Sequence, residues 1–219
     1  MGTYALLANL IPQSILATRL HVMERGDTES KHVGKISAVW RTLTASDIES
    51  LIRVANKIHP DLPESEEVFS ERIKLFPQGC LGLINDTGEL CGYLISHPIR
   101  YRQPPPLDHL VGEIAPDADQ YYIHDLAILP EYRGTGLAHR CIDMVLKDVA
   151  KQFPTTSLVS VYGTSTFWGR YKFEPPVSIE ETLGEKLACY GDDALYLERR
   201  KYEYVHSFIG MYTMLTDSH

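Results

Sequence analysis

The sequence has no excess of basic side chains. Its 219 residues include 21 Lys and Arg against 29 Asp and Glu, which gives a formal net charge of −8. Binding to nucleic-acid phosphates needs clustered Lys and Arg, so we expect no nucleic-acid partner. A negative balance suits a cationic substrate, although it is also a common means of keeping a protein soluble.

Long hydrophobic runs and paired cysteines are missing too. No apolar stretch approaches the ~20 residues that a membrane-spanning helix needs, so we expect no membrane partner. Cys80, Cys91, Cys141 and Cys189 show no Cys-x-x-Cys spacing. This argues against a metal site and a disulfide framework, so we expect a cytoplasmic protein without a metal. Residues 1–25 hold two arginines and no acid before Glu24, a composition that leaves organellar targeting open.

Two common nucleotide-binding motifs are also absent. A Walker A loop requires Gly-x-x-x-x-Gly-Lys followed by Ser or Thr, and the sequence contains none. The Rossmann fingerprint Gly-x-Gly-x-x-Gly fails at Gly134, because Gly136 is followed by Leu137, Ala138 and His139. A phosphate-binding site in this chain must therefore be of another kind.

The periodicity of the sequence predicts one α/β domain at residues 36–200, between an N-terminal extension (1–35) and a C-terminal tail (201–219). In chain order we expect a strand at 36–43, helices at 47–58 and 66–76, a hairpin at 80–95, a long proline-bearing connection at 97–120, a strand at 121–129, a helix from about 135 to 153, a strand at 157–163, a short amphipathic segment at 166–173 and a closing strand at 194–199. Thr44 or Ser46 is the expected cap of the first helix. The tail contains an apolar patch (208–215) that packs on the domain or forms a homodimer contact.

The most informative stretch is HDLAILPEYRGTGLA, residues 124–138, in which a strand runs into a glycine-broken turn and then a helix. Gly134 and Gly136 let the backbone approach a ligand and adopt a positive φ. Thr135 can cap the helix, whose first N–H groups have no intrahelical partner and lie at the positive end of the helix dipole. Arg133 adds a cationic, bidentate donor. The turn therefore predicts a site for a pyrophosphate.

The same stretch resembles a known family. LAILPEYRGTGLA (126–138), with the pattern Arg-x-x-Gly-x-Ala and an amphipathic helix behind it, resembles the acetyl-coenzyme A motif of the GNAT (Gcn5-related N-acetyltransferase) superfamily. FWGRYKF (167–173) is similar to the second signature of the family, and CYGDDALYLER (189–199) is similar to its closing strand. The resemblance covers residues 36–200. It implies an α/β fold with a central six- to seven-stranded mixed sheet, whose central strands splay apart and which is flanked by helices.

The resemblance also implies a binding mode for acetyl-CoA as cosubstrate. Backbone amides from the turn into the helix would bind the pyrophosphate: Arg133, Gly134, Thr135, Gly136, Leu137, Ala138 and His139. Leu126, Ala127 and Ile128 would line the pantetheine arm, which in this family pairs with the strand like an added β-strand. The main-chain amide of Leu126 or Ala127 would polarise the thioester carbonyl.

Acetylation of an amine needs a base, because alkyl ammonium groups are mostly protonated near neutral pH. Side chains alternate along a strand, so Tyr122, His124, Leu126 and Ile128 are expected on one face and Asp125 on the other. His124 would then lie beside the thioester, and the ordinary pKa of histidine, about 6.5, suits a base. Aralkylamine acetyltransferases of the superfamily are similar in having histidines on this strand. In the alternative interpretation, His124 is a core or rim histidine that binds a backbone carbonyl.

The leaving thiolate is commonly protonated in this family by a tyrosine of the second signature, a position that Trp168 occupies here. Tyr162, which ends the neighbouring predicted strand, is the first substitute. Tyr171, water, or no side-chain acid at all are the alternatives. Lys172 stands where the family usually has glycine, which puts the shape of the turn before Phe173 in doubt.

From these features we expect an N-acetyltransferase that moves the acetyl group from acetyl-CoA to a small primary amine by direct attack in a ternary complex. Two loops would select the acceptor, the connection at 97–120 and a loop at 59–67 that carries His59, Asp61, Glu64, Glu66 and Glu67. A protein lysine or N-terminus is an alternative acceptor. A non-catalytic CoA-binding regulator is an alternative class, favoured by Trp168.

Overall fold

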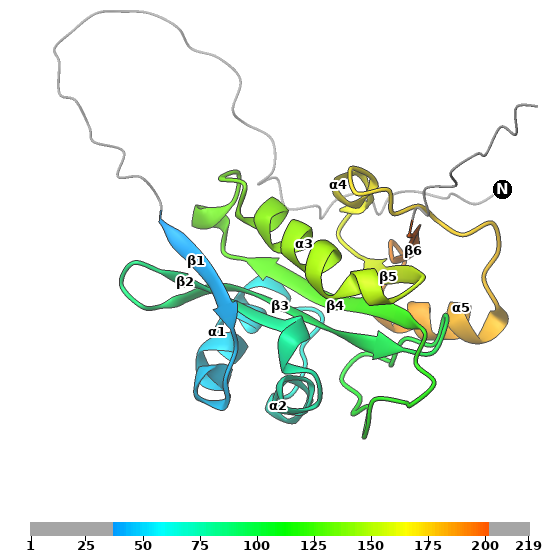
Figure 1. The fold of residues 1–219 in the computed structure, drawn as a ribbon, viewed down its shortest axis with the longest axis horizontal. Helices are drawn as coiled ribbons and strands as arrows, with labels where there is room; N and C mark the ends of the chain where they lie inside the picture. Colours follow the sequence, from blue (N-terminus) through cyan, green and yellow to red (C-terminus); the bar gives the residue numbers. More distant parts are fainter. Residues whose placement is uncertain (1–36, 202–219) are drawn as a thin grey trace, which may run out of the picture. The chain divides into compact units, whose positions relative to one another are not determined.

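The computed structural model of the protein describes residues 37–201 (Figure 1). The predicted extension and the apolar patch of the tail lie outside these residues. One six-stranded sheet has the order β1 (Ala38–Thr42), β2 (Cys80–Asn85), β3 (Leu90–Ile99), β4 (Gln120–Ile128), β5 (Thr155–Ser160) and β6 (Leu195–Arg200). All neighbouring pairs are antiparallel except β4 and β5, which are parallel. The predicted mixed sheet is confirmed.

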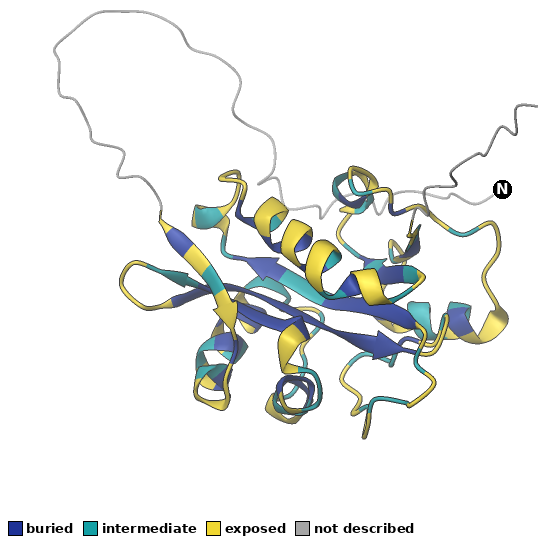
Figure 2. Ribbon diagram, viewed as in Figure 1, coloured by how far each residue is buried: buried dark blue, intermediate teal, exposed yellow. Residues whose placement is uncertain are grey.

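Helices cover both faces of this sheet (Figure 1). They are α1 (Ile48–Ile58), α2 (Glu66–Leu75), α3 (Leu137–Asp148), α4 (Ser165–Gly169) and α5 (Glu181–Leu187). Leu51 of α1 and Phe69 of α2 pack with Tyr93 in one apolar cluster, whereas Ile142 of α3 packs with Leu94 in another. Figure 2 shows the consequence, since the strands are mostly buried and the helices expose their outer sides. Within residues 37–201 there is no helix of the length and apolarity that crossing a bilayer demands.

The helices form where the apolar spacing predicts them. Ile48, Leu51, Val54 and Ala55 of α1 lie at helical spacing and are all buried. Neither predicted cap is the N-cap residue of α1, which is Asp47. Thr44 instead caps the 3-10 turn Ala45–Asp47 that leads into α1, where its backbone N–H donates to Asp47 Oδ2 at 2.8 Å in a capping box. The sequence pattern does not predict α5. Among the described residues of this helix, only Leu183 is buried. With so few buried positions there is no apolar stripe to read.

The sheet opens between its two central strands. β4 and β5 pair over four positions only, from Gln120 with Thr155 to Ile123 with Leu158. Beyond these positions, β4 continues to Ile128 and β5 to Ser160, but the two strands no longer pair with each other. The predicted splay is therefore present, and the edge of β4 that faces β5 is free from residue 124 onward.

A β-bulge lies in β4 at His124. Along β3, Ile95 pairs with Asp125 and the next residue, Ser96, pairs with Ile123, so His124 is left without a partner on β3. A bulge inserts one residue into one strand, and one inserted residue moves all later side chains to the other face.

The side chains beyond the bulge follow this shift. Leu126 packs in the cluster that contains Ile142 of α3, and Ala127 packs in the cluster that contains Leu51 of α1. Strict alternation predicts that Tyr122, His124, Leu126 and Ile128 share one face and that Asp125 lies on the other, and this prediction is wrong. Because of the bulge, His124 and Asp125 both face the side of α1 and α2, where each contacts the loop between these helices.

Candidate active site

A cavity of about 870 Å³ occupies the opening between β4 and β5. Its walls come from five segments: residues 58–64 after α1, residues 123–128 of β4, the turn and first residues of α3, the end of β5 with Tyr162, and α4. Leu107 of the long connection and Tyr190 near α5 add to one end. The predicted cofactor strand, the predicted pyrophosphate turn and the predicted base thus border one space.

The turn before α3 presents free N–H groups to this space. Gly134 and Gly136 have φ of 75° and 81°, a left-handed conformation that favours glycine. Within residues 37–201 the backbone N–H groups of residues 134–139 have no protein acceptor, and the first such bond is Arg140 N–H to Gly136 O at 3.1 Å. A helix N-terminus with unpaired N–H groups favours an anion.

The side chains of Arg133 and Thr135 both donate hydrogen bonds to backbone carbonyls near the turn. Thr135 does not cap α3, because Gly136 is the N-cap residue and Thr135 Oγ1 donates to Tyr132 O at 2.8 Å. The predicted capping role of Thr135 is thus wrong. Arg133 Nε donates to Ile128 O at 2.7 Å and ties the turn to the end of β4. Nine of the ten predicted cofactor residues line the cavity; Thr135 does not.

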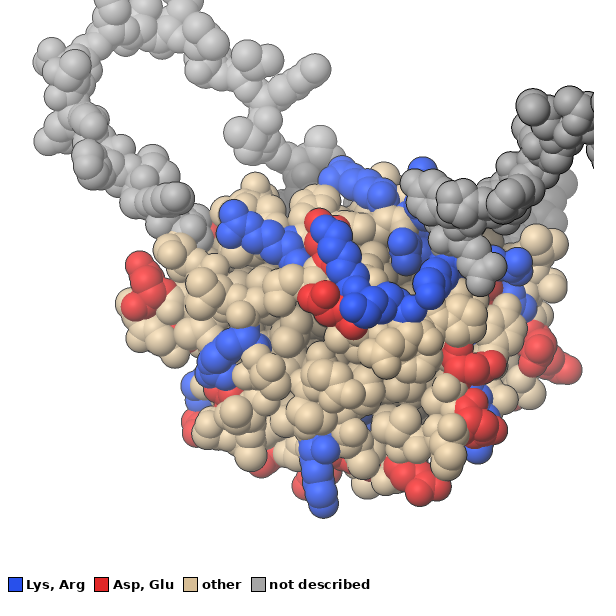
Figure 3. Space-filling view, in the orientation of Figure 1, with Lys and Arg blue, Asp and Glu red and all other residues tan. Residues whose placement is uncertain are grey.

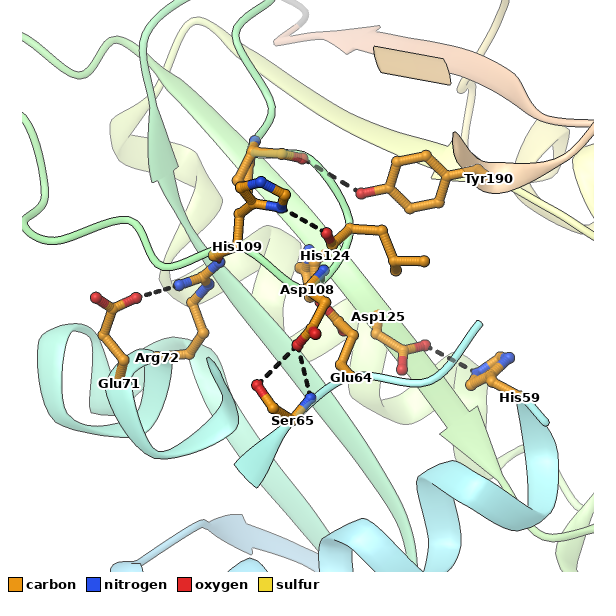
Figure 4. Close-up of polar contacts among 12 residues, drawn as sticks. His59, Glu64, Ser65, Glu71, Arg72, Asp108, His109, His124, Asp125 and Tyr190 are labelled. Atoms are coloured by element: carbon orange, nitrogen blue, oxygen red, sulfur yellow. Dashed lines mark hydrogen bonds and ion pairs between the residues drawn. The ribbon is translucent and has the colours of Figure 1, made fainter. Parts of the chain in front are cut away.

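His124 binds a carboxylate, not a backbone carbonyl. Its Nε2 lies 2.8 Å from Glu64 Oε2 and 3.0 Å from Glu64 Oε1, and the two side chains are only 1% and 6% exposed (Figure 4). Because a carboxylate can only accept, Nε2 carries the proton and the lone pair of the neutral ring is on Nδ1. Nδ1 is buried without a hydrogen-bond partner among the described residues. Nδ1 is thus the nitrogen of His124 that the protein leaves without a partner among residues 37–201.

Glu64 also joins the base to the long connection. The backbone N–H of Asp108 donates to Glu64 Oε1 at 3.1 Å, and Asp108 Oδ1 accepts from both the N–H and the hydroxyl of Ser65 at 2.7 Å (Figure 4). Asp108 has a φ of 54°, a conformation that costs energy for a residue other than glycine. These reciprocal bonds, which we call the 64–108 clamp, hold the connection against the start of α2.

A second histidine-carboxylate pair lies beside the first. His59, the C-cap residue of α1, places Nε2 3.2 Å from Asp125 Oδ1, and the Tyr93 hydroxyl also binds Asp125. Burial disfavours the charged ring, but the carboxylates of Asp125 and Glu64 outweigh it and raise the pKa of His59. Burial likewise opposes ionisation of Asp125, yet His59 and Tyr93 hold the pKa of Asp125 below its ordinary value. The carboxylates thus favour the charged form of His59, and His59 in turn favours the ionised form of Asp125.

The predicted acid Tyr162 stands next to this pair. It follows β5 with a φ of 54°, and its ring stacks on His59 at 5.6 Å between centroids and 10° between planes. Burial and the nearby acids, Asp61 first, raise the pKa of Tyr162. Trp168 is buried against Phe173, and an indole N–H is not an acid that a thiolate can deprotonate.

Sequence reasoning finds His124 but not its partners. Glu64 is 60 positions away, and only the bulge together with the α1–α2 loop brings the two side chains together. The same holds for His59 and Asp125. No pattern in the sequence identifies these pairs. Residues 37–201 contain no group of three or more His, Cys, Asp or Glu side chains placed to hold a metal ion.

The mixed sheet thus opens beside unpaired amides of a helix N-terminus, an arrangement that suits an extended, phosphate-bearing ligand. The chain belongs to the GNAT acetyltransferase family, because residues 46–162 match the family described as Acetyltransferase (GNAT) family. Members of this family are acyltransferases that use acetyl-CoA.

Solved structures with the same fold share little sequence with this chain. Ard1 from Thermoplasma volcanium is 14% identical with a TM-score of 0.55, over 77% of this chain and 100% of that chain. The loading GNATL domain of CurA from Lyngbya majuscula is 14% identical with a TM-score of 0.57, over 75% and 98%. N-acetylglutamate synthase from Neisseria gonorrhoeae, complexed with coenzyme A and N-acetyl-glutamate, is 19% identical with a TM-score of 0.54, over 77% and 36%. The curated proteins contain no match to this chain.

Proposed function

We propose that the protein transfers the acetyl group of acetyl-CoA to a small primary amine, by direct attack of the amine on the thioester in a ternary complex. One observation carries this proposal: a single cavity joins the unpaired amides of residues 134–139, the free edge of β4 and the His124–Glu64 pair. Each of these three features supplies one requirement of the reaction.

The first requirement is a seat for the cosubstrate. The N–H groups of residues 134–139 bind the pyrophosphate, and the free edge of β4 accepts the pantetheine arm as an added strand. Leu126 or Ala127 then offers a main-chain N–H to the thioester carbonyl, where negative charge develops during attack. N-acetylglutamate synthase was crystallised with coenzyme A on this fold, which supports the seat.

The second requirement is a base for the amine. An alkyl ammonium group has a pKa of about 10 and cannot attack until it loses a proton. His124 Nδ1 takes that proton, directly or through a water molecule, while Glu64 holds Nε2–H and stabilises the imidazolium that forms. The carboxylate thus acts as a positioning group behind the base.

The third requirement is a site for the acceptor. The 64–108 clamp holds the long connection on one side, and on the other side Lys186 Nζ donates to Pro104 O at 2.9 Å. Leu107 and Tyr190 close that end of the cavity. A walled space of this kind favours a small amine over an extended peptide.

Calorimetric titration with acetyl-CoA, followed by acetyl transfer to a panel of small amines and lysine peptides, tests the proposal. We expect binding, and transfer to at least one small amine in preference to the peptides. His124→Gln should lower kcat at saturating acetyl-CoA by about 10²- to 10⁴-fold and leave acetyl-CoA affinity near the wild-type value. Lys74→Gln is the control, because Lys74 is exposed on α2 and does not line the cavity.

Three results would contradict the proposal. Absence of acetyl-CoA binding removes the cosubstrate, and an unchanged rate in His124→Gln removes the base. Tight binding with no transfer to any amine favours the alternative class, a CoA-binding regulator, for which Trp168 at the position of the usual tyrosine is the supporting observation.

A further inference from the structure

The proposed reaction leaves one proton without a source. When the carbon–sulfur bond breaks, the CoA thiolate departs, and the family position for its proton donor holds Trp168, which is buried in the core. A simple thiol has a pKa of about 8.5, so a donor near neutral pKa would protonate the sulfur as it leaves. The side chains that line the cavity limit which group this donor is.

Five histidine and tyrosine side chains other than His124 line the cavity: His59, Tyr132, His139, Tyr162 and Tyr190. Tyr132 and His139 flank the pyrophosphate turn, away from the thioester end of β4. Burial raises the pKa of Tyr190, and its hydroxyl donates to Pro105 O at 3.3 Å. His59 and Tyr162 remain, and they stack on each other at the opening of the sheet.

Between these two, the phenol is the weaker donor. The pKa of Tyr162 is raised above the ordinary value for tyrosine, about 10. The pKa of His59 is raised above the ordinary value for histidine, about 6.5, because the carboxylates of Asp125 and Glu64 favour the charged ring. General acid catalysis is most effective when the donor is protonated at the working pH and still acidic enough to release its proton. The carboxylates of Asp125 and Glu64 favour the protonated form of His59, and an imidazolium is a stronger acid than a phenol.

The bulge at His124 brings this imidazolium next to the base. It turns His124 and Asp125 to the same face, where Glu64 binds the first and His59 the second, both from the loop after α1 (Figure 4). The side chains of the His59–Asp125 pair are 15% and 17% exposed, against 1% and 6% for His124 and Glu64. The two ring nitrogens of His59 are themselves buried: Nε2 lies in ion-pair contact with Asp125, and Nδ1 has no partner among residues 37–201. Asp125 immediately precedes Leu126, the expected position of the thioester.

We propose that His59, positioned by Asp125, donates the proton to the CoA thiolate, so that two adjacent histidine-carboxylate pairs divide the proton transfers of the reaction. This inference rests on the function proposed above. The charged and titratable groups that face His59 come from every neighbouring element: Asp125 of β4 with Tyr93 of β3 behind it, Glu64 of the α1–α2 loop, Arg133 before α3, and Tyr162 after β5.

The steps balance. The ammonium gives one proton to His124, and the nitrogen lone pair then forms the carbon–nitrogen bond at the thioester carbon. The tetrahedral adduct collapses, the carbon–sulfur bond breaks with its electron pair on sulfur, and His59 gives its proton to that sulfur. The new amide nitrogen loses its second proton to solvent, and His124 then releases the first to solvent. Because His59 takes one proton back, one proton in net is released. His59 regains its proton from solvent before the next turnover.

The test compares the dependence of kcat on pH among variants at saturating substrates. His59→Gln and His59→Asn remove the donor, Tyr162→Phe removes the rival donor, and Lys74→Gln, on the exposed side of α2 and outside the cavity, is the control. Acetyl-CoA affinity, measured by calorimetry, reports whether each variant keeps its fold and cosubstrate site. We expect the His59 variants to lose about 10- to 100-fold in kcat near neutral pH, less than the usual 10²–10⁴ because a thiolate is a fair leaving group.

The pH dependence separates an acid from a structural residue. Wild-type kcat should fall toward alkaline pH as His59 loses its proton, so the deficit of the His59 variants should shrink as the pH rises. Asp125→Asn should move this decline to lower pH, because the neutral amide no longer favours the imidazolium. Tyr162→Phe should keep the wild-type decline.

The opposite results overturn the inference. One is a wild-type kcat that stays level at alkaline pH, and another is a His59 variant with the wild-type kcat. A loss of kcat in the His59 variants that is equal at every pH, or an alkaline decline of kcat that disappears in Tyr162→Phe, would also overturn it. Wild-type protein that transfers no acetyl group rejects the proposed function itself. Wild-type transfer with unaffected His59 variants rejects only the role of His59.

Discussion

His124 and Asp125 are neighbours in the chain, and each contacts a residue of the loop after α1. His124 contacts a carboxylate, Glu64, whereas Asp125 contacts a histidine, His59. The strand supplies the histidine of one pair and the carboxylate of the other. In the first pair the carboxylate fixes which nitrogen of His124 holds the proton; in the second it favours the charged form of His59. At the residue scale, the chemistry of the site depends on these two carboxylates as much as on the histidines.

The carboxylate of Glu64 gives the first prediction. Glu64→Gln keeps an oxygen that accepts from His124 Nε2–H but removes the charge that stabilises the imidazolium. We expect kcat to fall by about 10²-fold, comparable with the lower range for general acid–base catalysis, with acetyl-CoA affinity unchanged. Steady-state kinetics at saturating acetyl-CoA measures this. Glu66→Gln, an exposed residue two positions on, should behave as wild type; equal rates in the two variants would remove Glu64 from the mechanism.

The His59–Asp125 pair also predicts a pH dependence of stability. Because folding raises the pKa of His59, its contribution is complete below the unfolded value, about 6.5, and is lost as the pH rises through the folded pKa. Because folding lowers the pKa of Asp125, its contribution is present above about 3.9 and is lost as the pH falls through the folded pKa. The difference in Tm between wild type and His59→Asn should therefore be largest between these limits and shrink toward alkaline pH.

Thermal unfolding of wild type and His59→Asn across this pH range shows whether the Tm difference shrinks or grows as the pH rises. The difference between the two proteins is the informative quantity, because His97 also titrates: burial lowers its pKa to about 3, so wild type and variant alike lose stability as the pH falls below about 6.5. A Tm difference that grows with rising pH would show that His59 is neutral in the folded protein.

At the element scale, the turn between β4 and α3 needs glycine for its left-handed backbone conformation. The groups it offers to a ligand are backbone N–H groups, not side chains. A Cβ at Gly136 would meet no atom within 4 Å, yet φ there is 81°. Gly136→Ala should thus cost about 1–2 kcal/mol through backbone strain alone, and weaken acetyl-CoA binding as the N–H groups shift. Gly169→Ala in α4, where space is also open and φ is not positive, should be neutral or slightly stabilising.

Chemical denaturation and calorimetry of both alanine variants test this pair of expectations. If Gly136→Ala and Gly169→Ala had the same stability and the same affinity for acetyl-CoA, the turn would not require its left-handed conformation.

The 64–108 clamp predicts how the long connection behaves. Asp108→Asn keeps a side chain that tolerates the positive φ but removes the charge that binds the two Ser65 donors. We expect faster amide exchange at residues 104–112 and a several-fold higher KM for the amine, consistent with loss of about 1–2 kcal/mol of hydrogen bonding. Acetyl-CoA affinity should not change. Asp117→Asn, which breaks only the exposed pair with Arg100, is the control; the same KM in both variants would show that the clamp does not shape the acceptor site.

The sequence predicts elements well where a strong period meets a turn of known chemistry. The helix after Gly136 and the hairpin around Gly88 are examples, since each combines apolar spacing with glycine at a positive φ. The bulge at His124 cannot be predicted in this way. A single inserted residue leaves no mark on the local pattern, and only the pairing of β3 with β4 reveals it. Every assignment of faces beyond it, including that of Asp125, depends on this one residue.

For the whole molecule, net charge is a poor guide to the charge at the site. The chain carries a net charge of −8, yet on the face shown in Figure 3 Lys and Arg side chains gather over α3, and most acids lie toward the lower and side margins. Acids lie instead at the other end of the cavity, where Asp61, Glu64 and Asp125 line it. This separation suits an anionic cosubstrate entering from α3 and a cationic amine entering from the loops.

The family and the sheet could be predicted from sequence because the turn of residues 133–138 is specific in its place between strand and helix. The proposed acceptor site could not, because its two loops meet through Glu64 and Asp108, which are 44 positions apart along the chain. Contacts at that separation follow from tertiary packing and not from local propensity.

The central claim is that acetyl-CoA lies along β4 and places its pyrophosphate on the N–H groups that precede α3. Amide hydrogen exchange with and without acetyl-CoA tests it residue by residue. We predict slower exchange at residues 134–139 and at 124–128 when acetyl-CoA is present, with little change in α1. Unchanged exchange at residues 134–139 under saturating acetyl-CoA would show that the pyrophosphate does not bind these N–H groups.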